Sequence, residues 1–215
     1  MKSKKIIGIT QRVDKFKSYN ESRDAIDERM ISWVVEAGFI PVTIPNNLVD
    51  NSLLESRQLV LDEWLKLLNI DAVILSGGNN IGDVPQRDLT ETCLLIWAEK
   101  NNKPVLGICR GMQMMGVHKG GKLIKADGHV NTHHSLQTDK NNHREFPYLV
   151  NSYHNYVLKD CPESFEVLAK SEDGHLEAMV HKKLPWEAWM WHPEREPIFS
   201  SIDIKRLKKL IESND

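Results

Sequence analysis

The sequence predicts an α/β fold, with a mostly parallel central sheet flanked by helices, in a single domain that covers residues 1–215. Two observations predict this fold. Short apolar runs alternate with segments of helical spacing along the first half of the chain, a pattern typical of parallel strands joined by helical crossovers. Two of these runs also lead directly into glycine-containing turns, Gly77-Gly78 and Gly107-Ile108-Cys109-Arg110-Gly111. The length of 215 residues suits one large α/β domain.

Taken in order, the first half of the chain is predicted to form strands at residues 5–10, 39–45, 70–75 and 104–106, and helices at 23–37, 56–68, 87–100 and after Cys109. The first helix is predicted from the helical spacing of Ile26, Met30, Trp33 and Val34, and Gly38 is placed to end it. The carboxyl ends of the strands in such a sheet are the usual place for an active site.

The segment between the first strand and the first helix is predicted to be a loop over residues 11–17. It carries the cations Arg12, Lys15 and Lys17, and Arg23 follows. Because the loop continues from the carboxyl end of the first strand, we expect it beside the active site. The alternative is a solvated loop whose cations face away from the site.

The second half of the chain has a different character. Residues 120–147 are polar and rich in histidine, which predicts loops and short strands. Strand-and-turn segments are predicted at 150–155 and 174–180, a short strand at 188–191, and an amphipathic helix at 202–211. The lysines on that helix are expected to be solvated.

Composition excludes several classes of function. The 28 basic and 30 acidic residues give a formal net charge of −2, so no basic surface favours nucleic acid as a partner. Three widely spaced cysteines indicate a reducing compartment and not a disulfide framework. The amino terminus has too few apolar residues for a signal peptide, and no apolar run reaches the ~18 residues of a membrane span. A cytoplasmic protein with no membrane partner is therefore expected.

Cys109 is the candidate nucleophile. An apolar strand, a sharp turn and a helix follow one another around it, which is the pattern of a nucleophile elbow. Gly107 and Gly111 flank it at two residues on either side, where a Cβ would crowd the strand against the helix. The amino terminus of the helix would favour the thiolate, the form of cysteine that attacks. The alternative is a buried structural cysteine beside an accidental pair of glycines.

A cysteine nucleophile needs a base, and His192 is the candidate among nine histidines. It ends the apolar strand predicted at 188–191, and Pro193 favours an extended backbone at the residue before it. In an extended segment Glu194 would point the same way as His192 and could fix its tautomer, as in a catalytic triad. The alternative is a histidine at a strand end beside a surface glutamate.

Attack on an amide also requires backbone donors for the oxyanion. The Arg110 amide follows the nucleophile at the start of a helix. Gly77-Gly78 leaves a neighbouring strand at the same edge, and two glycines let amide groups approach a ligand closely. We therefore predict an oxyanion hole from the backbone amides of Gly78 and Arg110. The alternative is an ordinary turn between a strand and a helix.

No metal site is predicted. His129, His133 and His134 lie close together in sequence, but Gly128 and the polar surroundings argue against a helix that would align them. Catalytic zinc usually needs three good protein ligands, and no cysteine lies nearby in the sequence.

Four stretches, ILSGGNNIGDVPQRDLTE, PVLGICRGMQ, VNSYHN and MWHPERE, together resemble the class I glutamine amidotransferases, and more narrowly their γ-glutamyl-γ-aminobutyrate hydrolase branch. The resemblance implies a flavodoxin-like fold and a Cys109–His192–Glu194 triad. It also implies substrate contacts from Gln113, Ser152 and His154, and it implies no cofactor.

The start of the chain, GITQR followed by RDAID, resembles relatives encoded with surface-polysaccharide genes, the γ-glutamyl-CDP-amidate hydrolases of capsule biosynthesis. Cations pair well with phosphate, so Arg12 is predicted to contact a phosphate-bearing leaving group. The ligand expected from this resemblance is a small γ-glutamyl conjugate, and a homodimer stays open as the assembly. The function favoured by the resemblance is a free-standing hydrolase of γ-glutamyl conjugates. The alternatives are a glutaminase subunit that passes ammonia to a synthase and a non-catalytic binding module.

Overall fold

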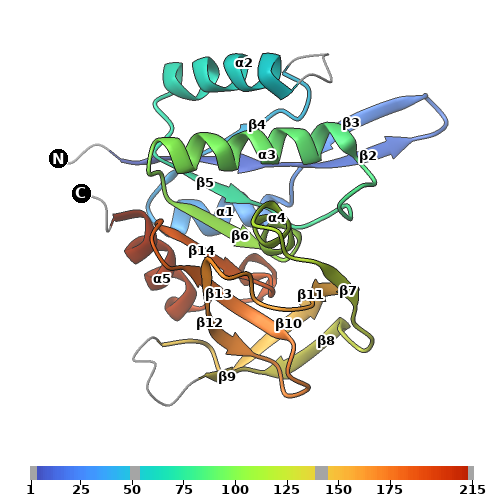
Figure 1. The fold of residues 1–215 in the computed structure, drawn as a ribbon, viewed down its shortest axis with the longest axis vertical. Helices are drawn as coiled ribbons and strands as arrows, with labels where there is room; N and C mark the ends of the chain where they lie inside the picture. The colour runs from blue at the N-terminus through green and yellow to red at the C-terminus, as the bar shows by residue number, and fades with distance from the viewer. Residues whose placement is uncertain (1–3, 49–53, 139–144, 213–215) are drawn as a thin grey trace.

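The computed structural model describes residues 4–48, 54–138 and 145–212, and it is built around one eight-stranded sheet (Figure 1). The order of its strands is β4 (Ile40–Ile44), β1 (Ile6–Thr10), β5 (Ala72–Leu75), β6 (Val105–Ile108), β14 (Trp186–Trp189), β13 (Leu176–His181), β12 (Phe165–Lys170) and β9 (Gln137–Thr138). The first five strands run parallel, and the last three pair antiparallel. The predicted α/β fold with a mostly parallel central sheet is confirmed.

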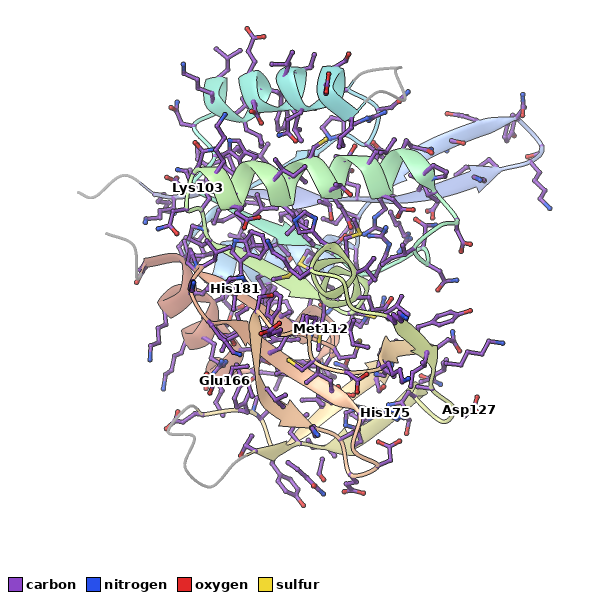
Figure 2. All side chains as sticks on the ribbon, viewed as in Figure 1. Lys103, Met112, Asp127, Glu166, His175 and His181 are labelled. Carbon is purple, nitrogen blue, oxygen red and sulfur yellow. The ribbon has the colours of Figure 1, made fainter. Side chains whose placement is uncertain are left out.

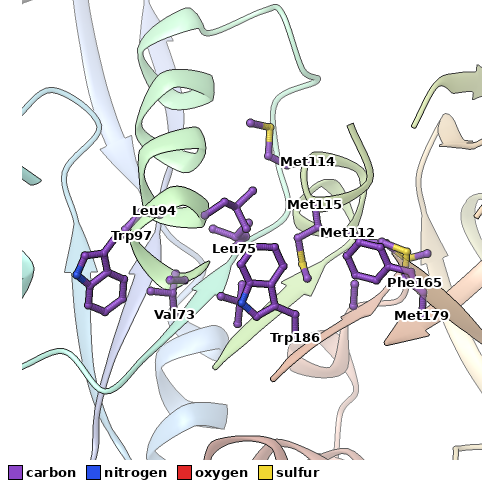
Figure 3. Close-up of a cluster of buried hydrophobic side chains, with 14 of the residues drawn as sticks. Val73, Leu75, Leu94, Trp97, Met112, Met114, Met115, Phe165, Met179 and Trp186 are labelled. Atoms are coloured by element: carbon purple, nitrogen blue, oxygen red, sulfur yellow. The ribbon is translucent and has the colours of Figure 1, made fainter. Parts of the chain in front are cut away.

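Helices cover both faces of this sheet. They are α1 (Glu28–Glu36), α2 (Leu54–Leu67), α3 (Pro85–Lys100), α4 (Arg110–His118) and α5 (Ser201–Glu212). One apolar core holds side chains of α2, α3 and α4 against the sheet, among them Leu94, Met112 and Met115 beside Trp186 (Figure 3). The core on the other face holds Trp33 of α1 and Leu207 of α5. The parallel strands are therefore buried on both sides, as parallel strands require.

Three two-stranded sheets complete the fold. They are β2 (Arg12–Phe16) with β3 (Glu21–Ala25), β8 (Val130–Ser135) with β10 (Leu149–Tyr153), and β7 (Leu123–Lys125) with β11 (Tyr156–Leu158). The last two confirm the short strands predicted within residues 120–147, of which 139–144 lie outside the described residues. In Figure 1 these two sheets lie beside the antiparallel half of the main sheet.

The segment that follows β1 differs from the prediction. Residues 11–17 were predicted to be a loop and 23–37 a helix, but β2 and β3 form an antiparallel hairpin that projects from the body (Figure 1). The helix starts only at Glu28, where the side chain of Asp27 accepts a hydrogen bond from the Arg29 amide. The spacing of apolar residues did not predict the hairpin, because its two strands are stabilised by pairing with each other.

No helix within the described part of the chain is both long and apolar enough to span a membrane.

Candidate active site

The predicted elbow forms at the carboxyl end of β6. Cys109 has φ 51° and ψ −105°, a conformation that non-glycine residues rarely adopt, and α4 begins at the next residue. The Cys109 amide donates to the carbonyl of Trp189 at 2.7 Å, which fixes this turn to β14. A Cβ on Gly111 would lie 2.0 Å from the carbonyl oxygen of Leu75, and one on Gly107 would lie 2.5 Å from Met115 Sδ. The steric need for both glycines is confirmed.

The predicted contact between His192 and Glu194 is present. His192 Nδ1 lies 2.6 Å from Glu194 Oε1, and both side chains are almost fully buried. The backbone path differs from the expectation, because β14 ends at Trp189 and a 3-10 turn over Pro193–Arg195 brings Glu194 back to the ring. The backbone at His192 itself is extended, as predicted, with φ −107° and ψ 91°, but Pro193 then starts the turn, so Glu194 is not on the same strand.

The ring of His192 also lies close enough to Cys109 for the two side chains to interact. Burial alone would lower the pKa of His192, but the charges of Glu194 and Cys109 and its hydrogen bonds to both outweigh burial and raise it to about 10. The ring is therefore cationic at neutral pH. This places a cation beside the sulfur of Cys109, at the amino terminus of α4.

The glycine loop after β5 lies against the same histidine. A Cβ on Gly77 would come within 2.5 Å of His192 Cε1, and Gly78 has φ +124°, which favours glycine. Asn79 holds the loop in place, because its side chain accepts from the Val13 amide at 2.8 Å and donates to the Val13 carbonyl at 3.0 Å. The loop is therefore in reach of the reacting atoms. Oxyanion binding by the Gly78 and Arg110 amides stays a prediction.

A buried charge network holds this edge of the sheet together. Glu91 of α3 is fully buried and accepts from Thr10 at 2.9 Å, from Arg87 at 3.0 Å and from Arg110. Burial opposes ionisation of Glu91, but Arg110 and Arg87 outweigh it and lower the pKa of the carboxyl. Arg87 also donates to the carbonyls of Ser76 and Gly77 at 2.7 and 3.0 Å. The ends of β1, β5 and β6 are thus tied to one carboxylate.

Sequence reasoning missed this network and also missed Asn151. The side chain of Asn151 accepts from the His192 amide at 3.0 Å and donates to the His192 carbonyl at 2.8 Å. It therefore clamps the backbone of the candidate base from β10. The i,i+4 pair Arg87–Glu91 on the core face of a predicted helix was a signal for the network. Nothing comparable distinguished Asn151.

The four predicted substrate contacts lie in different surroundings. Arg12 lines a cleft with Gly77, Gly78 and His192. Gln113 is buried one turn into α4 and donates to the carbonyl of Tyr156 at 2.8 Å. Their roles toward a substrate stay predictions.

Ser152 and His154 are both buried, on β10 and directly after it. The Ser152 hydroxyl donates to the carbonyl of His129 at 2.8 Å, so it already has a partner. Neither side chain offers exposed surface to a ligand in this conformation. Their predicted substrate role stays a prediction.

The histidine-rich segment is partly brought together by the fold. His129 and His134 face His154 and Glu177, whereas the side chain of His133 is 53% exposed and points elsewhere. In the sequence, His129, His133 and His134 lie close together as possible metal ligands. Folding supplies two further ligand-type side chains from other strands.

Comparison with known proteins identifies the family. The family model for glutamine amidotransferase class-I matches residues 19–200.

The chain belongs to the class I glutamine amidotransferases.

Individual relatives agree with this family. The chain is 28% identical over 212 residues to the gamma-glutamyl-CDP-amidate hydrolase of Campylobacter jejuni, a match that covers 92% of this chain and 94% of that protein. It is 30% identical over 178 residues to one of the subunits of the glutamine-hydrolysing GMP synthase of Thermococcus kodakarensis, covering 80% of this chain and 83% of that protein.

The fold is shared with a solved glutamine amidotransferase from Thermotoga maritima. The TM-score is 0.62 at 17% sequence identity, and the match covers 98% of this chain and 85% of that one. The amidotransferase family and its hydrolase member support amide-bond hydrolysis in general.

We expect Cys109→Ala to abolish amide hydrolysis, because loss of a triad nucleophile commonly costs many powers of ten in kcat. Glutamate release from a γ-glutamyl substrate measures this, and substrate binding should persist. Cys93→Ala and Cys161→Ala are the controls. Burial raises the pKa of the Cys93 thiol to about 11 and also raises that of Cys161, so both should stay protonated and unreactive. More than about a tenth of the wild-type rate in Cys109→Ala would remove it as the nucleophile.

We expect Glu194→Gln to be milder than His192→Ala, because the histidine moves protons whereas the carboxylate orients it. Glu194→Gln should also lower the pKa of His192 from about 10, since it removes the charge that raises it most. NMR titration of labelled histidine measures this pKa, and kcat measures the chemistry. A Glu194→Gln enzyme slower than His192→Ala, with an unmoved His192 titration, would contradict both roles.

Proposed function

We propose that this chain is a free-standing hydrolase that cleaves the γ-glutamyl amide bond of a small γ-glutamyl conjugate and releases glutamate. The observation that carries the proposal is the row Cys109–His192–Glu194 at the carboxyl edge of an amidotransferase sheet, in which Cys109 occupies the elbow and Glu194 lies 2.6 Å from the His192 ring. The intact row argues against a non-catalytic binding module. The reaction needs no cofactor.

The proposed reaction has two steps. In the first, the Cys109 thiolate attacks the γ-carbonyl carbon, and the amides of Gly78 and Arg110 stabilise the oxyanion. The imidazolium of His192 then gives its proton to the leaving nitrogen as the C–N bond breaks, which leaves a γ-glutamyl thioester. In the second step His192 takes a proton from water, the water attacks the thioester, and glutamate leaves as Cys109 is regenerated.

The favoured leaving group is a phosphoramidate-bearing nucleotide. The relative from Campylobacter jejuni, matched over nearly the full length of both chains, is a gamma-glutamyl-CDP-amidate hydrolase. Arg12 and Arg195 both line the cleft beside His192, and guanidinium groups pair well with phosphate. Arg12 pairs with Asp14 at 3.1 Å and would have to turn from it to a phosphate. The other predicted cations support this less, since Lys15 lies exposed on the hairpin and Arg23, which pairs with Glu21 at 2.8 Å, does not line the cleft. γ-Glutamyl-γ-aminobutyrate is the alternative substrate.

A second candidate function is a glutaminase subunit that delivers ammonia to a partner synthase. The relative from Thermococcus kodakarensis supports it, because that protein belongs to a glutamine-hydrolysing GMP synthase. The two functions differ in what the isolated chain does. A free-standing hydrolase cleaves conjugates without a partner, whereas a glutaminase of this kind would act on glutamine and need its synthase.

We expect the purified chain to cleave γ-glutamyl-CDP-amidate with a higher kcat/KM than γ-glutamyl-γ-aminobutyrate or glutamine. Arg12→Ala should raise KM for the nucleotide conjugate more than for glutamine, because only the former offers a phosphate to the guanidinium. Steady-state kinetics with the three compounds on both proteins measure this.

Lys15→Ala is the matched control, since it removes a neighbouring cation of the same strand that is exposed. Lys15→Ala should leave kcat/KM for all three compounds nearly unchanged. If the γ-aminobutyrate conjugate is the best substrate and Arg12→Ala affects all three equally, the phosphate proposal fails. If glutamine is best, and a synthase partner stimulates its cleavage, the glutaminase function replaces the hydrolase.

A further inference from the structure

A group of four ligand-type side chains lies buried next to the β8–β10 ribbon. His129 precedes β8, His134 lies on it, His154 directly follows β10, and Glu177 lies on β13. One ligand atom from each residue lies within 4.8 Å of the others. These residues come from three separate parts of the chain, so the fold alone brings them together.

Most polar atoms of this group lack a hydrogen-bond partner among the described residues. Both ring nitrogens of His134, both of His154 and both carboxylate oxygens of Glu177 are buried in this unpartnered state. His154 is 3% exposed and Glu177 is fully buried. Buried side-chain polar atoms in folded proteins nearly always have a partner. Six such atoms within one small group therefore indicate a ligand that accepts electron pairs.

The distances match a metal ion. Nε2 of His134 and Nε2 of His154 each lie 3.5 Å from Glu177 Oε1. This is too long for a hydrogen bond between well-aligned groups. Two ligand atoms in a tetrahedral zinc site, each about 2.0–2.2 Å from the ion, are separated by roughly 3.3–3.6 Å.

We propose that His134, His154 and Glu177, with a ring nitrogen of His129 as fourth ligand, bind a Zn²⁺ ion. Three imidazoles and one carboxylate are a donor set that suits zinc. All four positions come from the protein, which is the arrangement of a structural site and not of a catalytic one. The site is separate from Cys109, which supplies none of these ligands. His154, predicted from the family resemblance to contact the substrate, would instead hold the ion.

A second layer of contacts supports the fourth ligand. Asp173 Oδ2 lies 2.9 Å from His129 Nε2, and its carboxylate also lies 3.6 Å from His175 Nε2. A carboxylate that holds the second nitrogen of a histidine is the common outer contact of metal-binding imidazoles, because it fixes the tautomer and the ring. Figure 2 shows His175 in the lower part of the view, away from α2 and α3.

The position of the ion explains what it does. β10 carries Asn151, which clamps the His192 backbone, and the chain reaches the ligand His154 three residues later. The ion would join this strand to β8 and β13, and so hold the clamp in register. It acts by positioning and takes no part in bond breaking.

The test measures zinc in the untagged full-length protein, in a Cys109→Ala background so that the catalytic thiol cannot hold the ion. After incubation with Zn²⁺ and removal of free metal, elemental analysis should find about one Zn²⁺ per chain, and a chelator should lower the Tm. His134→Ala and Glu177→Gln should each cost tenfold or more in Zn²⁺ affinity, because loss of even an outer partner of a metal ligand costs about 10–100-fold. Glu177→Gln keeps the size of the side chain and guards against misfolding.

His133→Ala is the matched control, because this histidine lies on the same strand with its side chain 53% exposed. His133→Ala should bind zinc as tightly as the Cys109→Ala parent protein does. The proposal is overturned if the folded parent holds less than about a tenth of one Zn²⁺, or if Glu177→Gln and His134→Ala keep as much zinc as His133→Ala. Visible absorption of the Co²⁺-loaded protein reports the geometry independently of activity, and an octahedral spectrum would contradict a tetrahedral site.

Discussion

The carboxylate of Glu91 is the group on which the carboxyl edge of the sheet depends. A charge taken out of water is costly, and it persists in a protein interior only when paired and hydrogen-bonded. Glu91 meets this condition through Arg87, Arg110 and Thr10. Thr10 ends β1, Arg110 follows the elbow after β6, and Arg87 also binds the loop after β5. Removing one partner of a buried ion pair costs about 3–5 kcal/mol, so these segments keep one arrangement.

The strained turn at Cys109 depends on that arrangement. The residue keeps φ 51° because its amide is bound to Trp189, while α4 packs closely over β5 at Gly111. Neighbouring structure must determine such a backbone conformation, since it is costly in isolation. Rigidity of the network on one side and of β14 on the other therefore holds the sulfur beside His192. The catalytic ring is fixed in turn by Glu194 and by the clamp from β10.

Support for the site thus comes from two sheets. The parallel strands β5, β6 and β14 of the main sheet lead to the glycine loop, the nucleophile and the base, and β10 of a separate two-stranded sheet supplies the clamp on His192. The proposed zinc ion would join β13 of the main sheet to the separate β8–β10 sheet, and it would stabilise that sheet because two strands alone are only marginally stable. This gives a physical reason for two histidines of the segment 120–147, His129 and His134.

The sequence by itself determined the alternation of strands and helices, the elbow at Cys109 and the pairing of His192 with Glu194. These features depend on periodicity and on contacts between residues close in the chain, which the local pattern encodes. Tertiary structure alone decided the hairpin of β2 and β3, the burial of Glu91 between two arginines, the Asn151 clamp and the meeting of His154 with Glu177. Each of these depends on partners from distant parts of the chain, and only the folded structure determines which distant residues come into contact in the protein interior.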